Sequence, residues 1–291
     1  MLTLKAPAKI NWTLAVLAKR IDGYHDIQSL MQTISLYDSL AFAKSRHLRV
    51  VSSLTIPNER NLVYRAAQAL RAETACSLGA TITLSKDIPT GAGLGGGSSD
   101  AAATLKGLNQ LWQLGLSVGE LAEIGAAIGS DVPFFFAGAG AIVKGRGEIV
   151  APLQMTQRCV LLLVYPLFGV STVWAYSALA ERRARDLTNS QDNLDNIQLL
   201  FDILEKKDFS RSQPCLRNDL EEVVSAKHPV IGEIRQQLLD AGALAARMSG
   251  SGSTVFGLFP DEKKAEDASL RFPGCWTRVV RTLTYADDCR G

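Results

Sequence analysis

The chain has 291 residues, of which 47% are hydrophobic and 21% charged, with a formal net charge of +2. This length and composition fit a globular protein of one large domain or two closely packed lobes. The small net charge argues against nucleic-acid binding through bulk electrostatics. The five cysteines show no Cys-x-x-Cys spacing, so neither a zinc knuckle nor a disulfide framework is indicated.

No apolar run approaches the length of a membrane span, and the first residues lack the core and cleavage site of a signal peptide. We therefore expect a cytoplasmic protein that binds neither membranes nor nucleic acid. We expect it to be a monomer or a weak homodimer.

In chain order, residues 3–18 alternate in a way that predicts two strands, or one bent strand broken near Pro7. Lys9 is an isolated cation in this apolar stretch, and such a lysine usually faces solvent on an edge. The polar turn 19–26 contains Tyr24 and His25, which suit stacking on a base and hydrogen bonding to it, or simply form a capped turn. Further strands are expected at 27–35, 39–43, 48–51 and 80–85, and a helix at 61–74.

Five of the eleven residues from Pro89 to Ser99 are glycines, which indicates unusual backbone angles or close approach to another group. Ser98, Ser99 and Asp100 are favourable N-cap residues, and they precede a helix expected over 101–112. A helix N-terminus preceded by peptide groups without side chains favours an anion. The stretch therefore predicts a phosphate cradle, with a flexible turn as the alternative.

Three known glycine-loop chemistries fit this stretch poorly. A Walker loop needs a lysine before its Ser or Thr, and no lysine precedes Ser98 or Ser99. Gly91, Gly93 and Gly96 match the dinucleotide pattern, but the following residues predict a second helix rather than a strand. The lysine strand, catalytic loop and DFG motif of protein kinases are absent.

A helix is expected over 117–129, and Asp131 follows it directly before the apolar run Val-Pro-Phe-Phe-Phe. A carboxylate in such a position needs a partner, because desolvation disfavours its charged form. Capping of a short helix at Val132 and Pro133 provides one partner, and a lysine would be another.

A hairpin is expected at 139–144 and 148–152, and the strand pattern restarts after Cys159. These features predict lobes of residues 1–155 and 156–291. Strands are expected at 160–165, 244–248, 254–259 and 275–283, and helices from 171 and at 194–204, 219–226, 230–241 and 262–272. Residues 182–196 are predicted to be a mobile connection. The turn 249–253, Ser-Gly-Ser-Gly-Ser, is either a simple hairpin turn or a backbone that faces a phosphate.

Three separated motifs coincide with those of one family, the GHMP kinases. They are a strand motif at 5–11, the central glycine loop at 89–99 and a glycine-rich motif at 248–253. Four more resemble the members of that family that act on a cytidine diphosphate-linked methylerythritol: 7–11, 22–25, 129–133 and 218–221. The resemblance implies an α+β, two-lobe GHMP kinase fold. The N-terminal lobe would resemble the second domain of ribosomal protein S5, the C-terminal lobe would be a ferredoxin-like α/β unit, and the active site would lie in the cleft between them.

The resemblance also implies ATP-dependent phosphorylation of the substrate's 2-hydroxyl, with Lys9 and Asp131 as the catalytic pair. Asp131 would accept the hydroxyl proton or only orient the hydroxyl, while Lys9 would offset negative charge. The implied cofactors are ATP and Mg²⁺, with Ser99 as a metal contact. The implied ATP-binding residues are Pro89, Thr90, Gly91, Ala92, Gly93, Leu94, Gly95, Gly96, Gly97, Ser98 and Ser99. The implied substrate-binding residues are Asn11, Tyr24, His25 and Tyr176, with Trp174 as the alternative to Tyr176.

Two alternatives remain open at this point. One is another small-molecule GHMP kinase, such as a homoserine or mevalonate-type kinase, whose substrate carries no cytidine. The other is a non-catalytic nucleotide- or RNA-binding module, because folds of the first lobe are shared with RNA-associated domains.

Overall fold

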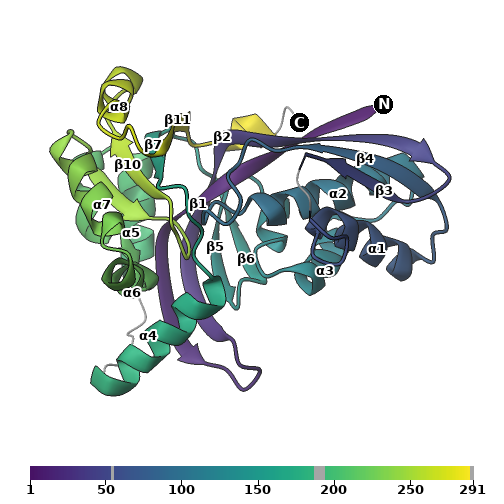
Figure 1. Cartoon of the computed structure of the whole chain (residues 1–291), viewed down its shortest axis with the longest axis horizontal. Helices are drawn as coiled ribbons and strands as arrows, with labels where there is room; N and C mark the ends of the chain where they lie inside the picture. Colours follow the sequence, from purple (N-terminus) through teal and green to yellow (C-terminus); the bar gives the residue numbers. More distant parts are fainter. Residues whose placement is uncertain (54–55, 187–193, 289–291) are drawn as a thin grey trace.

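The computed structural model describes residues 1–53, 56–186 and 194–288. It is an α+β structure built on two β-sheets, a larger one formed mainly by the first half of the chain and a smaller one formed by the second half. In Figure 1, β1 and β2 run along the right half and turn down between the two halves, so they reach both.

The larger sheet has the strand order β3-β4-β2-β1-β8, and β5 pairs with β2 and β6. Its strands are β1 (Leu2–Lys19), β2 (His25–Ser45), β3 (Arg49–Ser52), β4 (Gly79–Ser85), β5 (Gly140–Gly145), β6 (Ile149–Leu153) and β8 (Arg217–Asn218). The predicted break near Pro7 is a register shift between Pro7 and Ala8 within one continuous strand, because a β-bulge absorbs the proline without ending the pairing. The strands expected at 27–35 and 39–43 are likewise parts of the single strand β2, so that separation was wrong.

The smaller sheet is antiparallel throughout, with the order β11-β7-β10-β9. Its strands are β7 (Val160–Tyr165), β9 (Ala245–Met248), β10 (Val255–Phe259) and β11 (Trp276–Arg281). In chain order, the last strand pairs with the first and the third with the second, which is the ferredoxin-like arrangement that the resemblance implied. The division at 155/156 stays a prediction, since β8 comes from the second half but pairs with β1 in the larger sheet.

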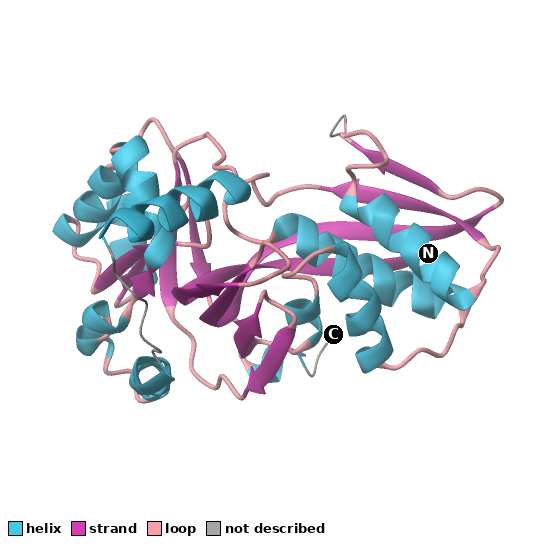
Figure 2. Cartoon of the chain, turned by 90° about the horizontal axis from the view of Figure 1, so that it is seen from below, coloured by secondary structure: helices cyan, strands magenta, loops and turns pink. Residues whose placement is uncertain are grey.

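The helices of the right half, α1 to α3, lie together against one face of the larger sheet (Figure 2). The α-helices are α1 (Leu62–Thr74), α2 (Gly96–Trp112), α3 (Val118–Ile128), α4 (Thr172–Asp186), α5 (Leu194–Glu205), α6 (Asp219–Lys227), α7 (Val230–Asp240), α8 (Glu262–Ser269) and α9 (Tyr285–Asp288). Short 3-10 helices span Pro133–Phe136, Phe209–Arg211 and Gln213–Cys215. Of the predicted connection 182–196, residues 182–186 end α4 and 194–196 begin α5, which corrects those parts, and residues 187–193 lie outside the described residues.

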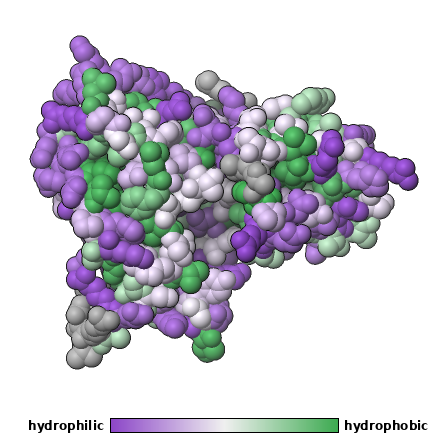
Figure 3. All heavy atoms as spheres, in the orientation of Figure 1, coloured by the Kyte–Doolittle hydropathy of each residue, from purple (hydrophilic) through white to green (hydrophobic). Residues whose placement is uncertain are grey.

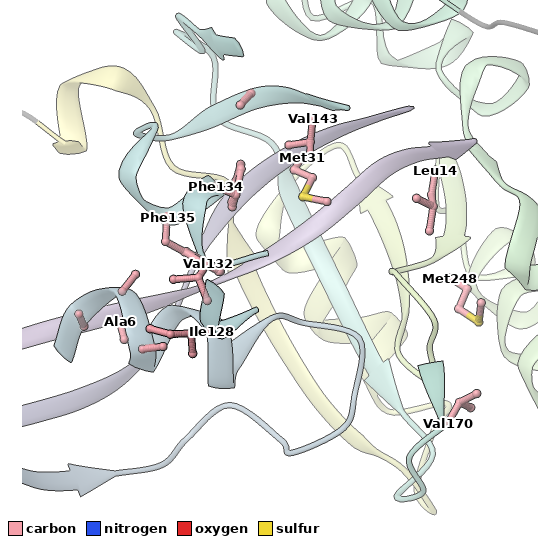
Figure 4. Packing of buried hydrophobic residues seen from close by; sticks show 14 of the residues in the cluster. Ala6, Leu14, Met31, Ile128, Val132, Phe134, Phe135, Val143, Val170 and Met248 are labelled. Atoms are coloured by element: carbon pink, nitrogen blue, oxygen red, sulfur yellow. The ribbon is translucent and has the colours of Figure 1, made fainter. Parts of the chain in front are cut away.

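The apolar run after α3 anchors the segment that carries Asp131. Val132 and Phe134 are fully buried, and Phe135 nearly so. Figure 4 shows Val132 next to Ile128 at the end of α3, with Phe135 and then Phe134 beyond Val132. Burial of each contributes roughly 1.5–3 kcal/mol, so the segment is held firmly while its carboxylate stays at the surface of the core.

Cys76, Cys159, Cys215 and Cys275 are free thiols, and Cys289 lies outside the described residues. Within the described ranges, none of the helices is both long enough and apolar enough to span a bilayer.

Candidate active site

A cavity of about 470 Å³ lies where β1, the glycine loop and α4 meet. Figure 3 shows this face of the molecule hollowed between its two halves. The predicted site residues that line the cavity are Lys9, Asn11, Pro89, Thr90, Gly91, Ala92, Gly93, Leu94, Gly95, Gly96, Gly97, Ser98, Asp131 and Tyr176. The cavity therefore brings together most of the residues that the resemblance implied, from both halves of the chain.

Helix α2 begins at Gly96, with Gly95 as its N-cap, rather than after Asp100. Gly91, Gly93 and Gly95 have φ values of +69°, +78° and +71°, so the loop turns on glycines in the left-handed region. The helix starts as soon as the chain leaves that region. The predicted capping by Ser98, Ser99 and Asp100 is therefore wrong, since these residues are the third to fifth of α2 and its N-cap, Gly95, makes no side-chain hydrogen bond. The helix N-terminus opens on the cavity and suits an anion.

The turn 249–253 is packed against the glycine loop. The hydroxyl of Ser249 donates to the carbonyl of Gly93 at 3.0 Å, and the N–H of Thr254 donates to the carbonyl of Ala92 at 3.2 Å. A Cβ atom on Gly93 would lie 2.2 Å from the carbonyl oxygen of Ser249, so only glycine fits there. The turn is thus more than a hairpin connection, because it packs directly against the glycine loop.

Lys9 and Asp131 lie together at the cavity. The ammonium of Lys9 is 3.5 Å from a carboxylate oxygen of Asp131 and donates to Oδ1 of Asn11 at 2.5 Å. Lys9 is only 3% exposed, because β2 pairs with β1 on one side of it and the glycine loop covers the other side; the alternative of a solvent-facing edge lysine is wrong. The 3-10 helix at 133–136 has no side-chain cap, so the capping alternative for Asp131 is also wrong.

Asn11 is buried and connects Lys9 to β2. Its Nδ2 donates to the hydroxyl of Ser29 at 2.9 Å, which leaves Oδ1 to face the ammonium. The backbone N–H of Lys9 donates to the carbonyl of Leu94 at 2.9 Å, which ties β1 to the glycine loop. These contacts fix the position of the Lys9 ammonium relative to the glycine loop.

Tyr24 and His25, the two residues of the predicted base-binding turn, have different surroundings. His25 stacks on Tyr176 of α4, with ring centroids 5.6 Å apart, whereas Tyr24 is 52% exposed and lies near the guanidinium of Arg146. Burial, followed by the charges of Lys19 and Arg183, lowers the pKa of His25, which favours its neutral form.

Trp174, the alternative aromatic residue, contacts His228 and Lys227 in a shallow groove between α4 and α6. It does not line the cavity. Of the two candidates, only Tyr176 is therefore placed to meet a ligand there.

Ser99 is 1% exposed, does not line the cavity and has no hydrogen-bond partner for its hydroxyl. Its neighbour Ser98 does line the cavity. Over the part of the chain that the structure describes, no group of three or more His, Cys, Asp or Glu side chains is placed to hold a metal ion.

Sequence reasoning missed a buried charge cluster next to the loop. The ammonium of Lys86 pairs with Asp38 and, at 2.8 Å, with Asp100, and both Lys86 and Asp100 line the cavity. Asp38 also accepts the backbone N–H groups of Asp87 and Ile88, just before the loop, at 2.7 and 2.9 Å. Burial raises the pKa of Asp100 to about 7. A lysine three residues before the glycine loop was the available signal.

Comparison with known proteins identifies the family of the chain. Models of the GHMP kinases N terminal domain and the GHMP kinases C terminal match residues 61–139 and 200–276. The 4-diphosphocytidyl-2-C-methyl-D-erythritol kinase of Thermodesulfovibrio yellowstonii is 51% identical over 97% of this chain and 98% of its own length. That of Synechococcus sp. strain JA-3-3Ab is 45% identical over 91% of this chain and 87% of its own.

Solved structures show the same fold. A crystal structure of 4-(cytidine 5'-diphospho)-2C-methyl-D-erythritol kinase superposes with a TM-score of 0.80 at 32% identity, covering 96% of this chain and 99% of that one. Homoserine kinase from Cytophaga hutchinsonii superposes with a TM-score of 0.72 at 20% identity, covering 97% and 94%, a likeness of fold alone. The expected two-lobe GHMP kinase fold is thus confirmed. With half of its residues identical to a relative over nearly its full length, the chain belongs to the GHMP kinases and, within them, to the 4-diphosphocytidyl-2-C-methyl-D-erythritol kinase family.

Proposed function

We propose that the protein transfers the γ-phosphoryl group of ATP to the 2-hydroxyl of 4-diphosphocytidyl-2-C-methyl-D-erythritol, in the non-mevalonate route to isoprenoid precursors. Membership of the family makes it an ATP-dependent small-molecule kinase. The observation that carries the assignment of the site is the contact between Lys9 and Asp131, 3.5 Å apart on a cavity bounded by the glycine loop.

The lining of the cavity supports one orientation of ATP. One group of its apolar side chains comes from α1, β4 and the segment before α1, namely Ile56, Leu62, Val63 and Leu84, and Leu62 lies 3.2 Å from the Cβ position of Gly97 at the start of α2. An apolar wall suits the adenine ring. The phosphates then meet the N-terminus of α2, where the glycine loop leaves backbone N–H groups for an anion.

Asp131 and Lys9 divide the chemistry between them. Asp131 is 32% exposed along its side chain, so one face of the carboxylate is free to accept the proton of the substrate hydroxyl or to orient it. Lys9 offsets the negative charge that develops on the transferred phosphoryl group. Phosphoryl transfer depends mainly on positioning and charge neutralisation, so two fixed groups beside the loop suit the reaction.

Mg²⁺ fits the oxygen groups present. The ion is usually held by one or two carboxylates, nucleotide phosphates and waters rather than by a full protein cage. The Asp131 carboxylate and the Ser98 hydroxyl line the cavity, and the unpartnered hydroxyl of Ser99 keeps that residue a candidate. When bound, the ion would neutralise phosphate charge.

The cytidine of the substrate would lie at the aromatic end of the site. Tyr176 offers a ring face, and neutral His25 offers both a hydrogen-bond donor and an acceptor for the edge of the base. Tyr24 and Asn11 remain predicted contacts, to the base and to the polar tail of the substrate.

The direct test is release of ADP from ATP and Mg²⁺ with 4-diphosphocytidyl-2-C-methyl-D-erythritol, homoserine or mevalonate as acceptor. We expect turnover with the first alone and inhibition by CDP. Indifference to CDP would favour another small-molecule kinase, and RNA binding with a steep salt dependence would favour a non-catalytic module. Asp131→Ala should bind both ligands but turn over at least about 100-fold more slowly; full activity of that variant would overturn the role of Asp131.

We further propose that the protein acts in the cytoplasm as a monomer or weak homodimer. The free thiols fit a reducing compartment. Sedimentation at micromolar concentration measures the oligomeric state.

A further inference from the structure

The segment Asn218-Asp-Leu-Glu221, which opens α6, has no part in the proposed chemistry, and none of its residues lines the cavity. Its first residue, Asn218, nevertheless lies on β8, next to the strand that carries Lys9. β8 pairs with β1 in parallel at Thr13 and Leu14, a short distance along β1 from Lys9 and Asn11. The segment is therefore placed to connect α6 to the site.

Asn218 and Glu221 hold the turn 249–253. The Nδ2 of Asn218 donates to the carbonyls of Met248 and Gly250, each at 2.8 Å. A carboxylate oxygen of Glu221 accepts the N–H of Met248 at 2.7 Å. Gly250 itself is so close to the site that a Cβ atom there would lie 3.1 Å from the carbonyl of Gly93 and 3.4 Å from the Lys9 ammonium. Asn218 thus holds the turn that packs against the glycine loop.

Asp219 contacts the end of β1 and α4 rather than the turn 249–253. One carboxylate oxygen accepts the backbone N–H of Val16 at 2.9 Å and the guanidinium of Arg183 at 2.6 Å, and the other accepts Nε of Arg217 at 2.5 Å. Arg183 also donates to the carbonyl of Val16 at 2.5 Å. These charge-assisted bonds clamp α4 to the end of β1.

Arg183 and Tyr176 are seven residues apart on α4, so they share one face of the helix. The end of β1 leads through a short turn to His25, the first residue of β2, which pairs with Lys19. Fixing α4 against β1 at Val16 therefore also fixes the stacking of Tyr176 on His25, the two rings that we assign to the base.

We propose that Asn218 and Asp219 are positioning residues that act on opposite ends of one active site. Asn218 sets the nucleotide end through the turn 249–253, and Asp219 sets the cytidine end through α4. The identity of the two ends rests on the proposed function.

The test compares Asn218→Asp with Asp219→Asn. Asn218→Asp keeps the oxygen that accepts the N–H of Leu220 but loses the amide that donates to the two carbonyls. The KM for ATP should therefore rise about tenfold, and the KM for the cytidine substrate should stay within twofold of wild type. Asp219→Asn loses the charge that holds two guanidinium groups. The KM for the cytidine substrate should therefore rise about tenfold, and the KM for ATP should stay within twofold of wild type.

The matched control is Glu222→Ala. Glu222 pairs with Arg182 and so also joins α6 to α4, but at the exposed surface away from the cavity. This variant should keep both KM values within twofold of wild type. If Asp219→Asn does not fold, Arg183→Lys replaces it, because a lysine cannot make the two-pronged contact to Asp219 and Val16.

Equal rises of both KM values in each variant, or unchanged values in both, would overturn the proposal. Calorimetric titration with CDP separates this outcome from failure of the proposed function. If wild type does not bind CDP, the substrate assignment is wrong. If wild type and Asp219→Asn bind CDP equally well, the positioning role is wrong.

Discussion

The ammonium of Lys9 and the carboxylate of Asp131 lie 3.5 Å apart, one on β1 and the other just after α3. A buried ammonium is costly unless it is paired, and Asn11 and Asp131 provide that compensation. Because Asp131 is partly exposed while Lys9 is not, the cation is fixed and the carboxylate remains open to a ligand. The pair therefore combines a fixed cation with a carboxylate that a substrate hydroxyl could reach.

Replacing Lys9 should impair turnover more than binding. In Lys9→Met the apolar stem is kept but the charge beside Asp131 is lost, so we expect kcat to fall by about 10²–10³-fold with both KM values within threefold. Steady-state ADP release measures this. The control is Lys5→Met, because Lys5 lies on the same strand but is exposed near the ring of Tyr37. Equal loss of activity in the two variants would contradict the catalytic role of Lys9.

Gly93→Ala should separate the glycine loop from the turn 249–253. The new Cβ would lie 2.2 Å from the carbonyl oxygen of Ser249, in addition to the strain of a non-glycine residue at φ +78°. Gly115→Ala is the matched control, since Gly115 has φ +73° but no atom within 4 Å of its Cβ position.

We expect Gly115→Ala to lower the free energy of unfolding by about 1–2 kcal/mol and to keep its activity. Gly93→Ala should lose more stability than that and raise the KM for ATP at least tenfold. Urea denaturation and kinetics measure the two effects. Equal behaviour of the two variants would show that the close packing at Gly93 is unimportant.

Tyr176→Leu should weaken binding of the cytidine substrate by about tenfold, because an aliphatic side chain loses the ring face that stacks on a base. Tyr176→Phe should stay within threefold of wild type. Trp174→Leu is the control, since Trp174 is on the same helix but contacts His228 and Lys227 away from the cavity. Titration with CDP measures all three. A larger effect at Trp174 than at Tyr176 would reverse the assignment.

Local patterns in the sequence predicted most elements well. β7 was placed at its observed bounds, and the helices starting near Asn61 and Ser117 have those residues as N-caps. Capping and periodicity are local signals, and these elements obey them. Prediction failed where tertiary contacts decide the outcome. The strands at 27–35 and 39–43 were separated by residues 36–38, which belong to the continuous strand β2. Asp38 is fully buried there because Lys86 and two backbone N–H groups satisfy it.

In the site, too, local signals predicted some features and tertiary contacts decided others. The glycine content of 89–99 predicted unusual backbone angles, and three of these glycines lie in the left-handed region, which requires glycine whatever the rest of the chain does. The pairing of Lys9 with Asp131 came from resemblance, since reasoning from each residue alone favoured an exposed lysine and a helix cap. Lys9 is buried because the glycine loop, far along the chain, covers β1 at this position, and no local pattern around Lys9 carries that information.

The last prediction concerns pH and Asp100. Burial, opposed by Lys86 and reinforced by Asp38, raises the pKa of Asp100 from 3.8 to about 7. Between pH 4 and 7 the folded protein therefore binds more protons at this group than the unfolded chain does. The free energy of unfolding should fall as pH rises through that range, with a slope of at most about 1.4 kcal/mol per pH unit from this group.

Asp100→Asn removes this titration while keeping an oxygen to accept from Lys86. The free energy of unfolding of the variant should depend less on pH between 4 and 7 than that of wild type. Above pH 7 the variant should be more stable relative to wild type than it is at low pH. Urea denaturation at pH 5, 6, 7 and 8 measures both slopes. Asp267→Asn, at an exposed carboxylate on α8, is the control and should keep the wild-type slope. Parallel pH profiles for wild type and Asp100→Asn would show that Asp100 is already ionised in the folded protein across this range, with Lys86 outweighing its burial.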